Sequence, residues 1–167
     1  MQIDIYTDGS FNRSIPNEVH GGAYMLIRNG ETATVSKVHF INKDRILTSM
    51  NNVGGELLAV VGILRTLIAV AEDSGNPDLF KGKTLNIFHD YSGVADWITG
   101  TWAAKNNGTI WYVNQVSLLK SKLGVDLEFH KVKGHSGCEG NTMADMVASY
   151  DLNYCKSNGV VIYNIKV

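Results

Sequence analysis

The sequence is short of cysteine, of proline and of any excess charge, and each shortage excludes a class of protein. Its two cysteines, Cys138 and Cys155, are too few for a disulfide framework or a structural zinc site, and they suit a reducing compartment. With 2 prolines and 44% hydrophobic residues, the 167 residues fit one compact domain. Because 15 Lys and Arg stand against 16 Asp and Glu, for a net charge of -1, any contact with nucleic acid must be local.

The N-terminal segment and the apolar runs show no sign of export or of a membrane span. The first residues, MQIDIYTDGS, place no basic region before an apolar core. No run approaches the roughly 18 apolar residues that a membrane helix requires. We therefore expect a cytoplasmic protein that has no membrane partner.

Alternation of apolar and polar side chains predicts strands in the first quarter of the sequence. Residues 3–8 alternate with a period of two, which indicates a half-buried strand that carries Asp8 near its end. Residues 20–29 and 32–42 are rich in β-forming side chains and share an Asn-Gly turn signal at 29–30, so we expect them to form a hairpin. These three strands should be antiparallel neighbours.

Helical spacing and short apolar runs alternate in the rest of the sequence. Apolar residues recur at helical spacing from 53 to 73, which predicts a long amphipathic helix. The next elements are a strand, two helices, a strand and a helix, at about 84–88, 91–99, 109–123, 125–132 and 141–152. This order predicts an α/β fold, a five-stranded mixed sheet with helices on both faces. The segment 160–165 is either an added strand or a partly ordered extension.

Four carboxylates lie at informative places in this order of elements: Asp8, Glu56, Asp90 and Asp145. Asp8 and Asp90 each end a strand, and parallel pairing of these strands brings both to the edge where open α/β sheets bind ligands. Clustered carboxylates repel one another and need a compensating cation. Their oxygen atoms suit magnesium, which keeps several waters and also binds substrate phosphate oxygens. The pattern therefore favours phosphodiester chemistry.

Each candidate residue, taken alone, also fits a structural role. Asp8 fits a turn, and Glu56 fits a favourable position in the dipole of a helix. Asp90 fits a helix N-cap, Asp145 a solvent-facing helix position, and His135 an ordinary loop histidine. A structural interpretation of the set requires all of these roles to hold at once, whereas one functional site explains them together.

Four sequence segments, in order and with matching spacing, resemble type 1 ribonuclease H. They are residues 3–10 (IDIYTDGS), 52–59 (NVGGELLA), 89–91 (HDY), and 133–137 (KGHSG) followed by Asn141 and Ala144-Asp145. The resemblance implies a ribonuclease H-like fold, with a catalytic domain at 1–152 and an extension of uncertain structure at 153–167. It also implies an endoribonuclease that hydrolyses the RNA strand of RNA/DNA hybrids, leaving 5′-phosphate and 3′-hydroxyl ends.

The resemblance also implies the role of each site residue. Asp8 would bridge two divalent ions, magnesium or alternatively manganese, with Glu56 and Asp90 completing one ion site and Asp145 the other. His135 matches a family histidine that assists proton movement or product departure. We expect His135 to be helpful and the acidic cluster to be primary.

Substrate contacts follow from the same resemblance. Asn52 matches a position that contacts the 2′-hydroxyl, the group that distinguishes RNA from DNA, although a helix N-cap is an alternative role. The backbone amides of Gly9 and Ser10 are expected to meet the RNA strand. Trp102 and Lys105 occupy the place of a basic handle that grips the DNA strand, although Trp102 also suits the core. The resemblance favours a monomer.

Two other functions remain open at this point. Integrases, resolvases and some exonucleases resemble ribonuclease H in architecture and in their acidic site. The segments 133–137 and 52–56 favour the hybrid nuclease over these relatives. The other alternative is a non-catalytic hybrid-binding domain, which the presence of all four carboxylates disfavours.

Overall fold

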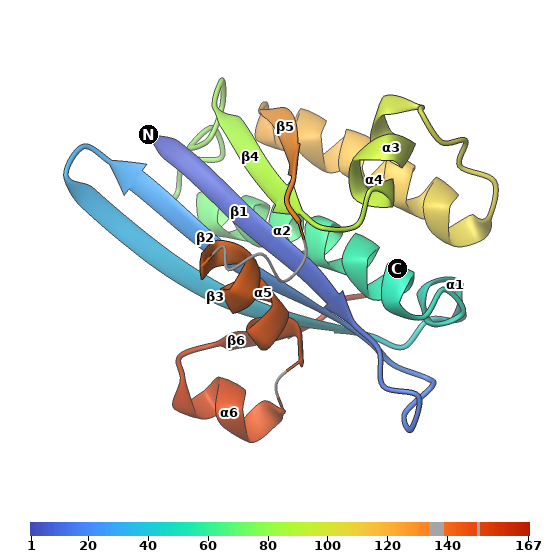
Figure 1. Ribbon diagram of the computed structural model, residues 1–167. Helices are drawn as coiled ribbons and strands as arrows, with labels where there is room; N and C mark the ends of the chain where they lie inside the picture. Colours follow the sequence, from blue (N-terminus) through green and yellow to red (C-terminus); the bar gives the residue numbers. More distant parts are fainter. Residues whose placement is uncertain (134–138, 150) are drawn as a thin grey trace.

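The computed structural model describes residues 1–133, 139–149 and 151–167. In chain order its elements are β1 (Gln2–Ser10), β2 (Val19–Asn29), β3 (Thr32–Asn42), α1 (Arg45–Thr48), α2 (Asn52–Asp73), β4 (Thr84–His89), α3 (Gly93–Thr99), α4 (Asn107–Leu123), β5 (Asp126–Lys131), α5 (Glu139–Ser149), α6 (Leu152–Ser157) and β6 (Val161–Asn164). The strands form one sheet in the order β5-β4-β1-β2-β3-β6 (Figure 1).

The sheet combines antiparallel and parallel pairing, as the sequence predicts. β1, β2 and β3 are antiparallel neighbours, and the hairpin between β2 and β3 turns at Gly30, whose φ of 64° suits glycine. β4 pairs with β1 in parallel, and β5 pairs with β4 in parallel. The chain from β1 to β4, which runs through β2, β3 and the helices α1 and α2, thus crosses over and brings the ends of both strands to the same edge of the sheet.

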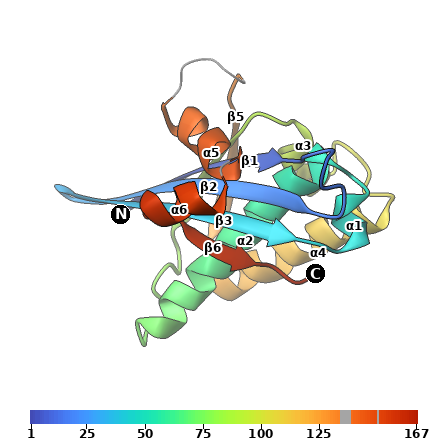
Figure 2. The same cartoon turned by 90° about the horizontal axis from the view of Figure 1, so that it is seen from below.

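Helices cover both faces of the sheet, which confirms the predicted layers. α2 packs on β1 and β2 and against α4, while α5 packs on the opposite face over β1, β2 and β3 (Figure 2). Although we expected no segment with the character of a membrane span, α2 has the length and hydropathy of one, and its most apolar 18-residue window has a mean hydropathy of 1.9. Because 67% of its most apolar window is buried, α2 is the central core helix of this domain.

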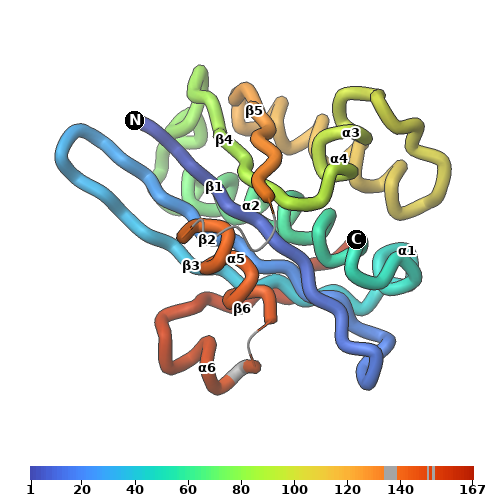
Figure 3. The backbone as a smooth tube through the Cα atoms, viewed as in Figure 1, coloured from blue at the N-terminus to red at the C-terminus, as the bar shows by residue number. Residues whose placement is uncertain are grey.

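The sheet has six strands, so the prediction of five is wrong. The additional strand, β6, pairs in parallel with the edge strand β3 (Figure 3). Asn42 donates a hydrogen bond from Nδ2 to the carbonyl of Ile165, at 2.7 Å, and thereby holds the chain beyond β6. Most of the side chains of β6 are exposed, so the strand is stabilised mainly by backbone hydrogen bonds, which leave little alternation in the sequence.

Two helix predictions also change in detail. The single helix predicted at 141–152 is instead α5 followed by the short helix α6, whose N-cap Asp151 accepts a hydrogen bond from the amide of Tyr154. The short helix α1 was not predicted. Its N-cap is Asp44, whose carboxylate accepts a hydrogen bond from the amide of Ile46 at 3.0 Å.

Candidate active site

Two glycines bring the first turns of α2 against the end of β1. A Cβ atom on Gly9 would lie 2.3 Å from the amide nitrogen of Glu56, and a Cβ on Gly55 would lie 2.4 Å from the carbonyl oxygen of His20. Only glycine permits backbones to approach this closely. The approach sets Glu56, in the second turn of α2, beside Asp8 on β1.

The pairing of β4 with β1 adds the third carboxylate. Tyr6 is paired with Phe88, and continuation of this register sets Asp8 level with Asp90. Side-chain oxygens of Asp8, Glu56 and Asp90 all lie within 4.8 Å of one another. Asp8 and Glu56 are buried, whereas Asp90 is half-buried. The structure therefore places three of the four predicted carboxylates in one cluster.

α5 contributes Asp145 from the opposite face of the sheet. Asp145 lines a cavity of about 190 Å³ together with Asp8, Asp90, Asn141 and Thr142. It also adds to the polar environment of Asp8, whose pKa it helps to raise. Asp8, Asp90 and Asp145 thus line one small polar cavity, and Glu56 joins them through its cluster with Asp8 and Asp90.

The electrostatics of the cluster are those of a cation site. Burial raises the pKa of Asp8 to about 6, and the negative charge of Asp90 adds to this rise, while hydrogen bonds from Glu56 and the Gly9 amide oppose it. Burial and the charge of Asp8 raise the pKa of Glu56 well above its ordinary value. Glu56 Oε2 is buried without a hydrogen-bond partner among the described residues. Unpaired carboxylate oxygens at this spacing fit a hard divalent cation such as Mg²⁺.

The positions of the four carboxylates do not fit the purely structural roles that the sequence left open for them. Asp8 lies within β1, so it does not form a turn. The N-cap of α3 is Ser92, so Asp90 is not a helix cap. Glu56 is buried inside α2, and Asp145 is half-buried at the cavity. Each position instead directs a carboxylate toward the same site.

Of the residues predicted to assist catalysis or contact the RNA strand, the structure describes Asn52, Gly9 and Ser10. His135 lies outside the described residues. Asn52 is exposed at the first position of α2, and the N-cap is its neighbour Asn51, so the capping role considered for Asn52 is wrong. The amide of Gly9 donates a hydrogen bond to the carboxylate of Asp8 at 2.9 Å, which orients the carboxylate. Ser10 is half-buried at the end of β1.

Trp102 belongs to a surface cluster of aromatic rings. Its ring meets Trp97 and Tyr91 edge to face, with centroid distances of 5.4 and 6.1 Å. Trp102 is 39% exposed and lies outside the core, and Lys105 is exposed in the same loop. Trp97, in contrast, packs against the main core. The loop after α3 therefore offers an indole and an ammonium group to solvent.

Sequence reasoning quoted Asn141 in the last family-like segment without giving it a role in the site, and it did not single out Asn51 or Arg45. Asn141 is buried at the cavity, one helical turn before Asp145, and this spacing of four positions was a signal that could have identified it. Asn51 has a φ of 55°, a strained conformation for a residue other than glycine, and no sequence pattern indicates it. Arg45 lines a shallow hollow with Asn106 and thus brings a second cation near the loop of Lys105.

The stability of the metal-free protein should depend on pH through Asp8. Because folding raises the pKa of Asp8 from 3.8 to about 6, its ionised form destabilises the folded state above pH 6, and this penalty disappears as pH falls toward 4. His39 and His89 act in the opposite sense, since burial lowers their pKa values. We therefore compare wild type with Asp8→Asn, whose stability advantage at pH 7.5, about 1–3 kcal/mol, should vanish near pH 4. Thermal unfolding in metal-free buffer measures this difference, and an advantage that stays constant with pH contradicts the expectation.

Asp90→Asn should raise the unfolding temperature of the metal-free protein at neutral pH. The substitution removes a negative charge that lies within 4.8 Å of two buried carboxylates. The expected rise is roughly 2–4 °C, which about 1 kcal/mol produces in a domain of this size. Asp96→Asn, in the first turn of α3, is the matched control and should not raise the midpoint. A midpoint for Asp90→Asn below that of wild type would show that Asp90 stabilises the fold.

Comparison with known proteins agrees with this geometry. The RNase H family model matches residues 1–153. A ribonuclease H of Verminephrobacter eiseniae is 30% identical over 96% of both chains. A ribonuclease H of Chromohalobacter salexigens is 31% identical over 89% of this chain and 82% of its own.

Solved structures show the same fold at lower identity. The N-terminal RNase H domain of a Mycobacterium tuberculosis protein superposes with a TM-score of 0.62 at 18% identity, covering 95% of this chain and 98% of that one. LC11-RNase H1, solved in complex with an RNA/DNA hybrid, gives a TM-score of 0.57 at 13% identity over 88% of this chain and 96% of its own. With a family match along nearly the whole sequence and relatives of 30% identity, the chain belongs to the ribonuclease H family of enzymes.

Proposed function

We propose that the chain hydrolyses the RNA strand of RNA/DNA hybrids with two divalent ions, leaving 5′-phosphate and 3′-hydroxyl ends. The observation that carries the proposal is the cluster of Asp8, Glu56 and Asp90 oxygens within 4.8 Å of one another, beside the cavity that Asp145 also lines. An oxygen of Glu56 is buried and unpaired among the described residues. Family membership supports the activity, and a neighbour of the same fold, LC11-RNase H1, was solved with a hybrid.

In this proposal the four carboxylates form two sets of metal ligands that share Asp8. Asp8, Glu56 and Asp90 hold one ion, and Asp8 with Asp145 holds the other. Bound there, magnesium or manganese ions supply Lewis-acid stabilisation of the attacking and leaving oxygens of the phosphodiester. The Gly9 amide keeps the carboxylate of Asp8 in the orientation that both sets share.

Other residues of the chain select and orient the substrate. Asn52, exposed at the start of α2, contacts a 2′-hydroxyl of the RNA strand, which distinguishes RNA from DNA. Ser10 and the backbone at Gly9 position the RNA strand beside Asp8. His135 moves a proton or assists product departure, as its family position implies.

Trp102→Ala should weaken hybrid binding with little loss of stability. The exposed indole contributes about 1–3 kcal/mol if it stacks on a base and less if it meets only sugar, so the Michaelis constant should rise while turnover changes little. Lys105→Ala should weaken binding and flatten its salt dependence by about one charge. Lys122→Ala, at the far end of α4, is the control for a lost cation. A strongly destabilised Trp102→Ala protein whose folded fraction binds normally would contradict the assignment of Trp102 to hybrid binding.

Digestion of end-labelled substrates tests the proposed function directly. The wild-type protein should cut the RNA of a hybrid in the presence of magnesium and leave duplex DNA, duplex RNA and single strands intact. Chelation should stop the reaction, and the new ends should carry 5′-phosphate and 3′-hydroxyl groups. Cleavage of duplex DNA instead would identify another nuclease of this fold, and hybrid binding without cleavage would identify a binding domain.

A further inference from the structure

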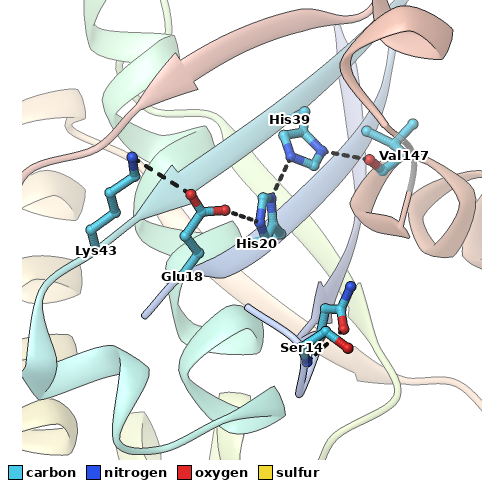
Figure 4. A network of polar contacts seen from close by, with 7 residues as sticks. Ser14, Glu18, His20, His39, Lys43 and Val147 are labelled. Carbon is cyan, nitrogen blue, oxygen red and sulfur yellow. Dashed lines mark hydrogen bonds and ion pairs between the residues drawn. The ribbon is translucent and has the colours of Figure 1, made fainter. Parts of the chain in front are cut away.

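A chain of polar contacts runs beneath α5 on the face of the sheet opposite α2. It joins Lys43, Glu18, His20 and His39 to the backbone carbonyl of Val147 in α5 (Figure 4). The contact distances are 2.7 Å from His39 Nδ1 to the Val147 oxygen and 2.8 Å from His20 Nδ1 to His39 Nε2. His20 Nε2 lies 3.1 Å from one Glu18 oxygen, and Lys43 lies 3.5 Å from the other.

The three contacts made by the histidine rings require three protons. The carbonyl of Val147 and the carboxylate of Glu18 only accept hydrogen bonds, so each needs an N–H, and the contact between the rings needs a third. Two neutral imidazoles supply only two N–H groups. One ring, His20 or His39, is therefore an imidazolium while the network is intact.

The positions of the two rings decide which one is charged. His39 is 1% exposed, and burial lowers its pKa, an effect that the neighbouring His20 strengthens and the bond to Val147 opposes. His20 is more exposed and lies directly against the carboxylate of Glu18. His39 is therefore the neutral ring and donates from Nδ1 to Val147, while His20 bridges His39 and Glu18.

Charged groups from several elements face this network. Glu18 and Lys43, at the ends of β2 and β3, contact each other and approach the rings from the edge of the sheet. Asp151, the N-cap of α6, and Lys156, within α6, line the same pocket as His20 and His39. Of these four charged groups, the Glu18 carboxylate is the one in contact with a ring, 3.1 Å from His20 Nε2.

The acceptor at Val147 is a backbone carbonyl near the end of α5. Within the described residues α5 runs to Ser149, so Val147 lies in the last described turn, and a helix leaves the carbonyl groups of its last turn without intrahelical donors. The N–H of His39 takes the place of that missing donor at the negative end of the helix dipole. His39 thereby ties the end of α5 to β3.

One row of paired residues connects this tie to the catalytic cluster. Asp8 on β1 is paired with Gly22 on β2, and Gly22 is paired with His39 on β3. α5 rests on the middle of the row, because a Cβ on Gly22 would lie 2.4 Å from the amide nitrogen of Ala148. Asp145 meets the cavity on the Asp8 side, and Val147 meets the row on the His39 side. The bond from His39 thus holds α5 on one side of Gly22, and Asp145 lies on the other side.

We propose that His39, supported by His20 and Glu18, is a positioning residue that fixes the turn of α5 bearing Asp145 and thereby sets the affinity of the acidic site for divalent metal. The proposal rests on the proposed function, in which Asp145 is a metal ligand. His39 touches neither substrate nor metal and acts only through the helix.

Metal binding by matched variants tests the positioning role. His39→Leu removes the bond to α5, whereas Asn42→Leu removes a comparable buried bond from the same strand to the carbonyl of Ile165, away from α5. By calorimetry with Mn²⁺, His39→Leu should bind about 10-fold more weakly than wild type, the scale expected for outer-shell support of metal ligands. Asn42→Leu should bind like wild type, and His39→Asn, whose amide can occupy the place of Nδ1, should recover most of the affinity.

Kinetics and spectroscopy complete the test. His39→Leu should need more magnesium for half-maximal activity while the Michaelis constant for the hybrid stays unchanged. ¹⁵N spectra of the wild-type protein at neutral pH should show His39 protonated at Nδ1 alone. Equal metal affinities for His39→Leu and Asn42→Leu would overturn the positioning role, and so would a His39 protonated only at Nε2. In either case, hybrid cleavage by the wild-type protein would still support the proposed function. A wild-type protein that neither binds Mn²⁺ nor cuts hybrid would overturn both.

Discussion

Asp8→Asn should abolish hydrolysis of the hybrid while the protein remains folded. Asp8 is central to the acidic cluster. Its oxygens lie within 4.8 Å of those of Glu56 and Asp90, and it lines the same cavity as Asp145. An amide of almost the same volume keeps the packing of β1 but removes the negative charge that both ligand sets require. Initial rates in magnesium should fall by at least about 10²–10³-fold, as when one preorganised electrostatic group is removed from an active site.

Asp4→Asn is the matched control for this substitution. Asp4 lies on the same face of the same strand and is 7% exposed, against 6% for Asp8. Its carboxylate is compensated by Arg28 at 2.9 Å, Gln2 at 3.0 Å and Asn86 at 3.1 Å. Asp4→Asn should therefore lower stability by about 1–2 kcal/mol and leave activity within a few-fold of wild type. If Asp8→Asn also stayed within a few-fold, Asp8 would have no part in the mechanism.

Gly22→Ala should separate α5 from the sheet and disable the site. The added methyl group would lie 2.4 Å from the amide nitrogen of Ala148 and 2.7 Å from the carbonyl oxygen of Ala144, so the helix must shift. A displacement of Asp145 by about 1 Å is enough to lower turnover by about 10²-fold. Overpacking should also reduce the free energy of unfolding by about 1–3 kcal/mol.

Gly62→Ala separates the loss of stability from the loss of the site. A Cβ at Gly62 would lie 2.6 Å from the ring of Phe40, on the opposite face of the sheet from α5. Both glycine variants should unfold at lower temperatures, but only Gly22→Ala should lose affinity for Mn²⁺. Equal metal affinities in the two variants would show that α5 keeps its position despite the added methyl group.

Two buried carboxylates on β1, Asp4 and Asp8, differ in whether neighbouring side chains compensate their charge. Both carboxylates are buried on β1 four positions apart, and alternation in the sequence treats them alike. Asp4 has its charge balanced by side chains from β2 and β4, whereas the neighbours of Asp8 are further carboxylates. The uncompensated member marks the site, because buried like charges are retained where a cation is bound.

Local sequence was sufficient for most of the fold. Period-two alternation predicted β1 and the hairpin of β2 and β3, and helical spacing predicted α2 within one residue of its observed start. The order of elements predicted the crossover between β1 and β4. Four family-like segments singled out Asp8, Glu56, Asp90 and Asp145, and the structure brings these four carboxylates close together.

Other features depended on contacts that only the folded chain makes. β6 was undecided because four mostly exposed residues carry no alternation, and the strand exists because the edge of β3 offers unpaired backbone groups. His20 and His39 are 19 positions apart, and the register of β2 on β3 makes them diagonal neighbours on one face. The sequence by itself thus determined which residue types could form strands, helices and a metal site, since these depend on local periodicity and spacing. Tertiary structure alone decided which of the buried polar groups are compensated and which are not, because that depends on strand register and on the seat of α5 at Gly22, both of which arise from contacts between residues distant in the chain.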